Sequence, residues 1–389
     1  MDEKINSIPE KDENEQVEAT PKKSRAKLYV AAFLVVGLVL VFMLLFLNRN
    51  NFKKNGSANI TQKSSIENAT SDNDEGSNAT KISQYIESQR NSDSSYKYQS
   101  HEEVTCPEVA GKKKCFYEEN NSVPVNSWTA LGHYSSYKSS GDTSELEKSK
   151  RDLVTLYDWC KSRVNDCTYL LTQPLTISAD YADENMMTFL EKESAALVAQ
   201  KPATDLMLLS IEARELVLLS KFLKDSSLLV KAKTRLDMAQ EEVQKQYLNP
   251  FVPKVILPKY TCWVTLAQVE MGIVENDKTA VINALEYLKI NDRFQAIGNF
   301  ENPVHIHPCI ETFMVGGKYL ENSGYKDNAR KLLTDFLTNF YDASDNKILF
   351  GEGGTTFYSK SKSTNPSSNM VLISDTAYTN YLIYLNSTL

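Results

Sequence analysis

The sequence predicts an all-α protein, an array of αα-hairpins that follows a single N-terminal transmembrane helix and a flexible tether. A helical pattern of apolar residues, a short polar break and a second helical pattern recur along residues 127–389. Glycine is scarce, at 14 of 389 residues. One uninterrupted apolar run lies near the N-terminus. The net charge of −7 lacks the basic patch of a nucleic-acid-binding protein, so no nucleic acid is expected as a partner.

The N-terminal residues predict a cytoplasmic tail and a membrane anchor. Residues 1–27 are polar, rich in Glu and Lys, and without periodic pattern, which is typical of a disordered tail. Leu28 to Leu47 is apolar and carries no charge, and a run of about 20 such residues spans a bilayer as a helix. A cleaved signal peptide is the alternative, but the apolar region is too long and no small-x-small cleavage site follows it.

The charges around the anchor favour a cytoplasmic N-terminus. Four basic residues lie within residues 22–27 and three within residues 49–54, so the positive-inside bias is slight. Every cysteine follows the anchor, as expected if the C-terminal part is extracytoplasmic. We therefore predict a single-pass protein of the cell membrane that contacts lipid through Leu28 to Leu47.

The segment after the anchor is predicted to be a flexible linker. Residues 48–100 are dominated by Ser, Asn, Lys, Asp and Gln, and a run such as SSIENATSDNDEGSNATKIS has little apolar surface to bury. The composition changes near Cys106, where Tyr, Leu, Trp and Phe begin to recur at helical spacing. We assign residues 101–389 to one extracytoplasmic α-helical domain.

The six cysteines occur in pairs, which predicts disulfides in an oxidising compartment. CPEVAGKKKC, from Cys106 to Cys115, and CKSRVNDC, from Cys160 to Cys167, each predict a small loop closed by a disulfide. Free thiols are the alternative for both pairs.

The helical hairpins share one kind of turn. The breaks lie at residues 139–142, 224–226, 275–277 and 322–324, and contain Gly, Asn, Asp or Ser. Gly and Asn tolerate a left-handed backbone at a helix end, and Asp or Ser then caps the next helix. Such recurrence predicts a stacked helical array. An ordinary helical domain whose turns share composition is the alternative.

Cys262 and Cys309 each lie at the start of the first helix of a hairpin. Equivalent positions meet when first helices pack side by side in parallel, and a Cys262–Cys309 disulfide then follows naturally. This geometry suits a ring with the first helices inside, and equally an open solenoid.

The segments ALGHYSSYKSSGDTSELEKSKRDL and GGKYLENSGYKDNARKLLTDF resemble hairpins of the six-hairpin α/α-toroid proteins. This superfamily includes many glycoside hydrolases, polysaccharide lyases and sugar epimerases. The resemblance covers residues 127–389 and implies twelve helices in six hairpins. The sequence shows ten or eleven, one of them poorly patterned between Tyr181 and Gln200, so it leaves open whether the hairpins close into a ring.

In such a ring, loops at the starts of the inner helices line a cleft. The resemblance implies that ligand-binding residues lie there, because aromatic rings stack on sugars. The expected ligand-binding residues are Trp128, Tyr260, Trp263, His305, His307, Glu352 and Tyr378.

Glu311 and Asp375 are the predicted catalytic pair, because glycoside hydrolysis needs two carboxylates about 5–10 Å apart. The alternative is that both acids only favour a helix N-terminus. Zinc bound by His305, His307 and Cys309 is a further alternative, which fails if Cys309 is in a disulfide. We expect neither metal nor cofactor.

The long loop at residues 350–369 includes Glu352 and is interpreted either as a lid or as a plain surface loop. The favoured function is a membrane-anchored surface protein whose helical domain binds a glycan or protein ligand. A carbohydrate-active enzyme of the six-hairpin kind, a hydrolase, lyase or epimerase, is the alternative. A scaffold for protein partners is a third reading.

Overall fold

The computed structural model of the 389-residue chain divides into two compact units, residues 1–63 and 64–389. It describes residues 75–97, 99–101, 108–109, 112–113, 121–163, 167–248, 257–290, 303–348 and 370–389. All of these residues belong to the second unit, where they form twelve α-helices and eight short strands.

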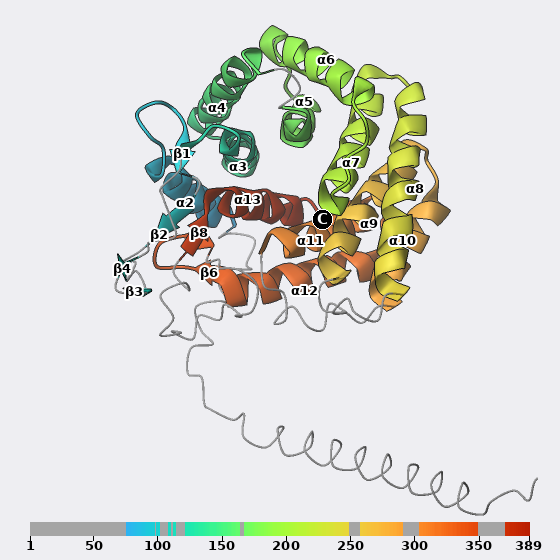
Figure 1. Ribbon diagram of the computed structural model, residues 1–389. Helices are drawn as coiled ribbons and strands as arrows, with labels where there is room; N and C mark the ends of the chain where they lie inside the picture. Colours follow the sequence, from blue (N-terminus) through green and yellow to red (C-terminus); the bar gives the residue numbers. More distant parts are fainter. Residues whose placement is uncertain are drawn as a thin grey trace, which may run out of the picture. The chain divides into compact units, whose positions relative to one another are not determined.

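Six helices form a closed inner ring in the second unit (Figure 1). Each packs against the next inner helix, and α13 packs against α3. The ring is therefore closed, which decides between the closed ring and the open array that the sequence leaves open. The inner helices are α3 (Val125–Ser140), α5 (Thr172–Ser178), α7 (Leu206–Leu223), α9 (Leu257–Val274), α11 (Pro303–Tyr319) and α13 (Ile373–Ser387).

The other six helices pack against the outside of this ring (Figure 1). Five of them are the return helices of hairpins that begin with α3, α5, α7, α9 and α11. The sequence predicts four of these hairpins, and the one formed by α5 and α6 is not among them. A short 3-10 helix, Thr168–Leu170, precedes α5. The outer helices are α2 (Glu75–Ser88), α4 (Thr143–Lys161), α6 (Glu184–Ala199), α8 (Ser227–Leu248), α10 (Lys278–Ile290) and α12 (Ser323–Phe340).

The ring closes where α13 meets α3. A Cβ atom on Gly132 would lie 3.1 Å from the Cβ of Ala377, so the two helices approach closely there. The Asn380 side-chain amide donates to the backbone oxygens of Ala79 at 3.3 Å and Gly132 at 3.0 Å, and to Ser136 Oγ at 2.8 Å. One amide of α13 thus fastens both α2 and α3.

The hairpin turns share a left-handed residue followed by Asp or Asn. Only Gly141 and Asn276 are residue types that favour this backbone, so the turns at Lys224 and Glu321 depart from the prediction. Gly141 ends α3 in the left-handed region, with φ 75°, and Asp142 then accepts a hydrogen bond from Ser144 N at 2.9 Å. A left-handed residue followed by Asp or Asn recurs at the other three predicted breaks. The left-handed residues there are Lys224, Asn276 and Glu321.

Helix α2 corrects the assignment of residues 48–100 to a flexible linker. Ala79, Ile82 and Ile86 are fully buried, and α2 packs against α3 and α13. These apolar residues lie three and four positions apart, which is helical spacing. The average composition of the segment predicts a linker because it is dominated by Ser, Asn and Gln, although its few apolar residues fall on one face of a helix.

A buried polar cluster also fastens α2 to α3 and α4. The Ser83 hydroxyl donates to Glu145, and His133 Nδ1 lies 2.6 Å from Ser83 Oγ and 3.0 Å from Glu145 Oε2. Burial acts to raise the pKa of Glu145. Hydrogen bonds from His133, Lys148 and Ser83 outweigh burial and hold the pKa of this carboxyl at about 2.

The strands are short and pair as antiparallel couples. Strand β2 pairs with β8 just before α13, with Gln99 opposite Leu372 and His101 opposite Met370. The other couples are β1 with β5, β3 with β4, and β6 with β7. The strands are β1 (Tyr96–Lys97), β2 (Gln99–His101), β3 (Glu108–Val109), β4 (Lys112–Lys113), β5 (Asn121–Ser122), β6 (Tyr341–Asp342), β7 (Lys347–Ile348) and β8 (Met370–Leu372).

Two of the predicted disulfides are confirmed. Cys160–Cys167 closes the loop after α4, and Cys262–Cys309 joins the neighbouring inner helices α9 and α11. Cys106 and Cys115 lie outside the described residues, as do the tail and the predicted anchor, Leu28 to Leu47. Within the part of the chain that the structure describes, no helix is long and apolar enough to cross a membrane.

Candidate functional site

A buried charged group occupies the interior of the ring. Arg214 on α7 donates to Glu270 on α9, from Nε at 3.0 Å and from a terminal nitrogen at 2.8 Å. The same terminal nitrogen donates to Glu311 on α11 at 2.5 Å. Two carboxylates from different helices therefore share one guanidinium.

Tyr378 on α13 adds a fourth helix to this group, because its hydroxyl donates to Glu311. Burial and the negative charge of Glu311 raise the pKa of Tyr378 well above its usual value. The phenol therefore stays protonated and remains a donor. We call Arg214, Glu270, Glu311 and Tyr378 the central charged group.

The central charged group contains one cation and two carboxyls. Burial acts to lower the pKa of Arg214, but Glu270 and Glu311 raise it well above its usual value, so the guanidinium stays charged. Burial raises the pKa of Glu270, and the negative charge of Glu311 raises it further, while Arg214 opposes both effects. Because the net direction is upward, Glu270 is the carboxyl of this group suited to hold and release a proton.

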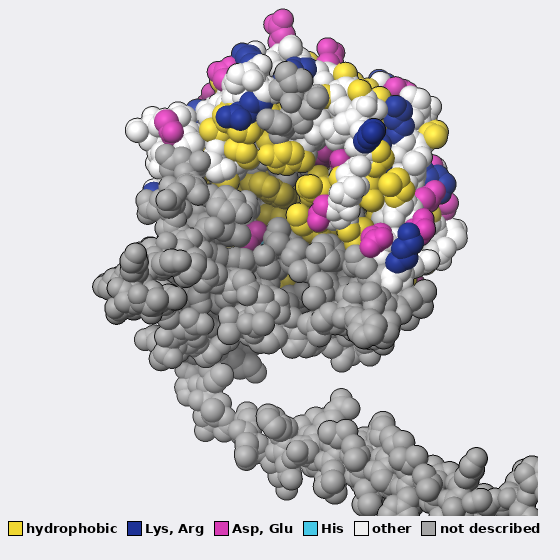
Figure 2. All heavy atoms as spheres, viewed as in Figure 1, with side chains coloured by type: hydrophobic (Ala, Val, Ile, Leu, Met, Phe, Trp, Pro, Cys, Tyr) yellow, Lys and Arg dark blue, Asp and Glu magenta, His cyan; other side chains and the backbone are white. Residues whose placement is uncertain are grey.

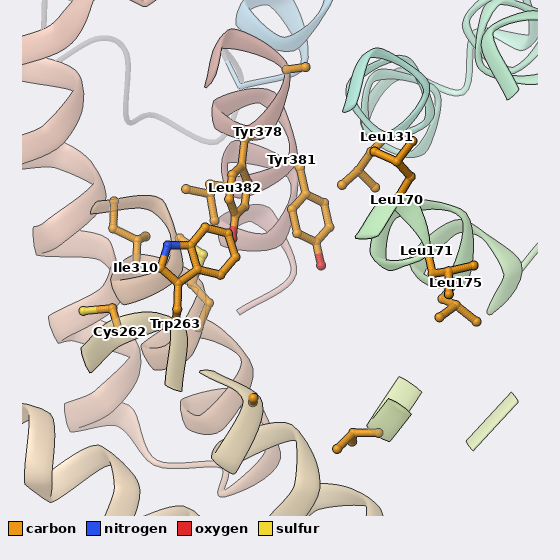
Figure 3. Packing of buried hydrophobic residues seen from close by; sticks show 14 of the residues in the cluster. Leu131, Leu170, Leu171, Leu175, Cys262, Trp263, Ile310, Tyr378, Tyr381 and Leu382 are labelled. Carbon is orange, nitrogen blue, oxygen red and sulfur yellow. The ribbon is translucent and has the colours of Figure 1, made fainter. Parts of the chain in front are cut away.

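Aromatic rings lie beside the central charged group. The Trp128 and Tyr378 ring centroids are 4.5 Å apart, and Trp128 is only partly buried. Figure 3 shows the ring of Trp263 turned toward Tyr378, while the Tyr381 hydroxyl points away from α13. Trp263, Tyr378 and Tyr381 are buried, so Trp128 is the ring of this set that can offer a flat apolar surface to a sugar.

His307 and Asp375 lie one helical turn before Glu311 and Tyr378 on the same two helices. The His307 Nδ1 and Asp375 Oδ1 atoms are 3.9 Å apart, too far for a direct hydrogen bond. Burial raises the pKa of Asp375 to about 8 and lowers the pKa of His307 to about 3. Both side chains are therefore uncharged at neutral pH.

The surroundings of His307 indicate packing within the wall of the ring. Its Nε2 lies 3.0 Å from Thr379 Oγ1, and its ring stacks near Tyr378 and, edge-on, near Phe336 of the outer helix α12. Within the described residues, His307 Nδ1 and Asp375 Oδ2 have no hydrogen-bond partner.

Figure 2 looks at the unit from the same side as Figure 1 and shows a hollow in this face. Apolar side chains line the visible wall of the hollow, and acidic side chains lie within it.

The structure brings together most of the residues that the sequence predicts for the site. Glu311, Asp375, His307 and Tyr378 share the interface of α11 and α13, and Trp128 stacks on it. Glu352 and the side chains of Tyr260 and His305 lie outside the described residues. In the described part of the chain, no cluster of His, Cys, Asp and Glu could hold a metal ion. Cys309 is in a disulfide, so the zinc alternative fails.

Sequence reasoning missed Arg214 and Glu270. Glu270 is the only charged residue between Cys262 and Val274, and Arg214 lies in the apolar segment Leu206–Leu223. A charge on the apolar side of a helix is rarely buried unless it is paired. That signal identifies Glu270 in α9, whereas Arg214 lies among Glu212, Glu215 and Lys221 in α7 and is not singled out by the sequence.

No family model matches this chain, and neither does any curated protein. Solved structures do match its fold. An unsaturated glucuronyl hydrolase specific for heparin superposes with a TM-score of 0.61 at 11% identity, covering 82% of this chain and 98% of that one.

Two further solved structures have similar folds. The GH76A α-1,6-mannanase from Salegentibacter sp. HEL1_6 matches with a TM-score of 0.55 at 11% identity, covering 81% and 99% of the two chains. A polysaccharide lyase matches with a TM-score of 0.53 at 9% identity, covering 82% and 98%. All three are six-hairpin α/α-toroid carbohydrate-active enzymes. The helical unit of this chain therefore has the six-hairpin α/α-toroid fold.

Proposed function

We propose that the helical unit is a carbohydrate-active enzyme, a hydrolase or lyase that acts on a glycan in the hollow of the ring. The main support for this proposal is the carboxyl pair Glu270 and Glu311. The two residues lie on neighbouring inner helices, and both accept a hydrogen bond from the same Arg214 nitrogen. The similar folds of a glucuronyl hydrolase, a mannanase and a lyase support this choice over a protein scaffold.

Hydrolysis suits the two carboxyls better than elimination does. Glycoside hydrolases need one carboxyl to protonate the departing oxygen and a second, charged one to stabilise the sugar cation or activate water. Glu270, whose pKa is raised, would supply the proton. Glu311, bound by Arg214 and Tyr378, would be the charged partner.

This proposal replaces the pair Glu311 and Asp375 with Glu270 and Glu311. Asp375 is directed toward His307, and its neutral form fits the wall of the ring. The α-1,6-mannanase becomes inactive when two consecutive aspartates are substituted. This chain has no two consecutive aspartates, and the proposed pair Glu270 and Glu311 comes from two different helices.

A glycan-binding protein without catalysis is the second candidate. Glu311 is fully buried and Glu270 is 8% exposed, so a substrate would need access that burial limits. In either case we propose that the unit is anchored by Leu28 to Leu47 and faces an oxidising compartment. The disulfides Cys160–Cys167 and Cys262–Cys309 support that location.

Product release from polysaccharides tests the enzyme proposal. The full chain would be incubated with α-1,6-mannan, heparin fragments that carry an unsaturated uronic acid, and neutral glucans, and reducing ends would be counted. We expect Glu270→Gln and Glu311→Gln to lower product release at least about 100-fold, because each removes a group needed for proton transfer.

Glu147→Gln is the matched control, because the Glu147 side chain is 69% exposed on an outer helix. Circular dichroism would confirm that each variant folds. Retention of glycan without products would support the binding protein instead. Full activity of Glu270→Gln, or loss only in Asp375→Asn, would overturn the assignment of the pair.

A further inference from the structure

A second concave surface lies on the outer wall, away from the hollow of the ring. A groove of about 540 Å³ runs between the outer helices α8 and α10 and has the inner helix α9 as its floor. Known ligand pockets have volumes of about 300–1,000 Å³. The groove is therefore large enough to hold a ligand of several rings.

Uncharged amide side chains line this groove from all three helices. Gln240 and Gln244 come from α8, Gln268 from α9 and Asn283 from α10. In the described parts of the chain, none of the four has a hydrogen-bond partner. Each amide has two donor hydrogens and one acceptor oxygen, so it can either donate a hydrogen bond to a ligand hydroxyl or accept one from it.

Among the described residues, the charged side chains of the groove are one cation and three carboxylates. Lys233 Nζ lies 3.3 Å from Asp237 Oδ1, and the Asp277 carboxylate accepts a hydrogen bond from Ala280 N. Asp277 and Glu275 lie at the end of the groove, at the turn to α10. The cation is therefore paired, and the groove favours an uncharged ligand over an anion.

Most of the remaining lining is apolar. Val264 and Met271 are buried along the floor and Leu236 is buried on the α8 wall, while the Tyr287 ring on α10 is 41% exposed. A flat ring above an apolar floor suits the C–H face of a sugar, while the amides reach its hydroxyls. An acidic glycan would gain no free cation in the middle of the groove.

We propose that this groove binds a neutral oligosaccharide chain, as a site separate from the centre of the ring. Such a site would hold a polysaccharide against the outer wall. The inference goes beyond the proposed catalytic function, because binding here requires no activity from Glu270 or Glu311.

Affinity electrophoresis of the full chain tests the groove. Native gels would contain linear α-1,6-mannan, a soluble β-1,4-glucan or heparin. We expect one or both neutral polymers to retard the chain, and heparin to leave its mobility unchanged. Gln268→Ala and Tyr287→Ala should each weaken retardation by about three- to tenfold, as expected for one or two lost contacts.

Two control variants make the result specific. Gln84→Ala removes an exposed glutamine from α2 and should retain the full retardation. Trp128→Ala alters the ring centre and should lower product release while leaving most of the retardation.

Four results would contradict the proposal that this groove binds a neutral oligosaccharide. In the first, neither neutral polymer retards the chain. In the second, Gln84→Ala and Gln268→Ala weaken retardation equally, and in the third, only Trp128→Ala abolishes it. In the fourth, an unstructured peptide releases the retarded chain and free oligosaccharide does not, which would mean that the groove binds peptides. Loss of catalysis in Glu270→Gln with retardation unchanged would leave the groove intact, so the two proposals fail separately.

Discussion

Arg214 and Glu311 form an ion pair between helices that are not neighbours in the ring, with a nitrogen–oxygen distance of 2.5 Å. Helix α9 lies between α7 and α11, and its Glu270 binds the same guanidinium. Three inner helices therefore converge on one cation in the interior of the unit.

Arg214→Met tests how far the fold depends on this convergence. The substitution leaves two buried carboxyls without their cation, and breaking a buried pair costs about 3–5 kcal/mol of unfolding free energy. Urea denaturation measures the loss. Arg330→Met is the control, because the Arg330–Asp327 pair is exposed and such pairs contribute about 0–1 kcal/mol. Adding Glu270→Gln and Glu311→Gln to Arg214→Met should recover part of the loss, and a strictly additive triple variant would contradict the pairing.

Asp375→Asn should change how stability depends on pH. Because burial raises the pKa of Asp375 to about 8, its contribution is fully present below about pH 4 and is lost as pH rises through 8. The asparagine variant lacks this loss, so its stability relative to wild type should increase from pH 5 to pH 8, by on the order of 1 kcal/mol per pH unit.

His307 contributes in the opposite direction, since its pKa is lowered to about 3. Its contribution is present above about pH 6.5 and is lost as pH falls through 3. It is common to both proteins and largely cancels in the comparison. A difference in thermal midpoint that stays constant from pH 5 to pH 8 would show that Asp375 is not the titrating group.

The two described disulfides should differ in their effect on stability. They enclose sequence separations of 47 and 7 residues. Loop-closure entropy predicts losses of about 4 kcal/mol for Cys262→Ala with Cys309→Ala, and about 2 kcal/mol for Cys160→Ala with Cys167→Ala. Denaturation of the two double variants under the same conditions gives the comparison. A reversed order would mean that strain or packing, and not loop length, dominates.

Truncation should show that α2 belongs to the folded unit. A chain that begins at residue 75 keeps Ile82 and Ile86, whereas one that begins at residue 91 loses both buried side chains. We expect the shorter chain to be less stable by at least about 4 kcal/mol, because each large-to-small loss in a core costs about 2–5 kcal/mol. Equal thermal midpoints would place α2 outside the cooperative unit.

Much of the fold could be predicted from local signals. The Gly141–Asp142 turn follows from backbone preferences that act within a few residues. The Cys262–Cys309 disulfide follows because equivalent positions of parallel helices meet. Closure of the ring could not be predicted in this way, since it depends on Asn380 reaching Ala79, which lies 301 positions earlier.

The site was partly predictable for a similar reason. The toroid resemblance directs attention to Glu311, close to Cys309, and to Tyr378 near the start of α13. Arg214 lies in the middle of α7 and Glu270 in the last third of α9, and a charge in a helical pattern is usually read as solvent-facing. Helix α5 was missed because it has only seven residues and contains Pro174.

The fastening of α13 by α2 and α3 has a mechanical consequence. Helix α2 is the first described helix of the unit, and the Asn380 amide joins it and α3 to the last one. A force applied to the chain from its N-terminal side would reach α2 before any other described helix. It would therefore act on the contacts of α13 with α2 and α3, where the ring closes. Resistance of the fold to force in that direction then depends first on the packing of α13 against α2 and α3, before the contacts between the other inner helices are loaded.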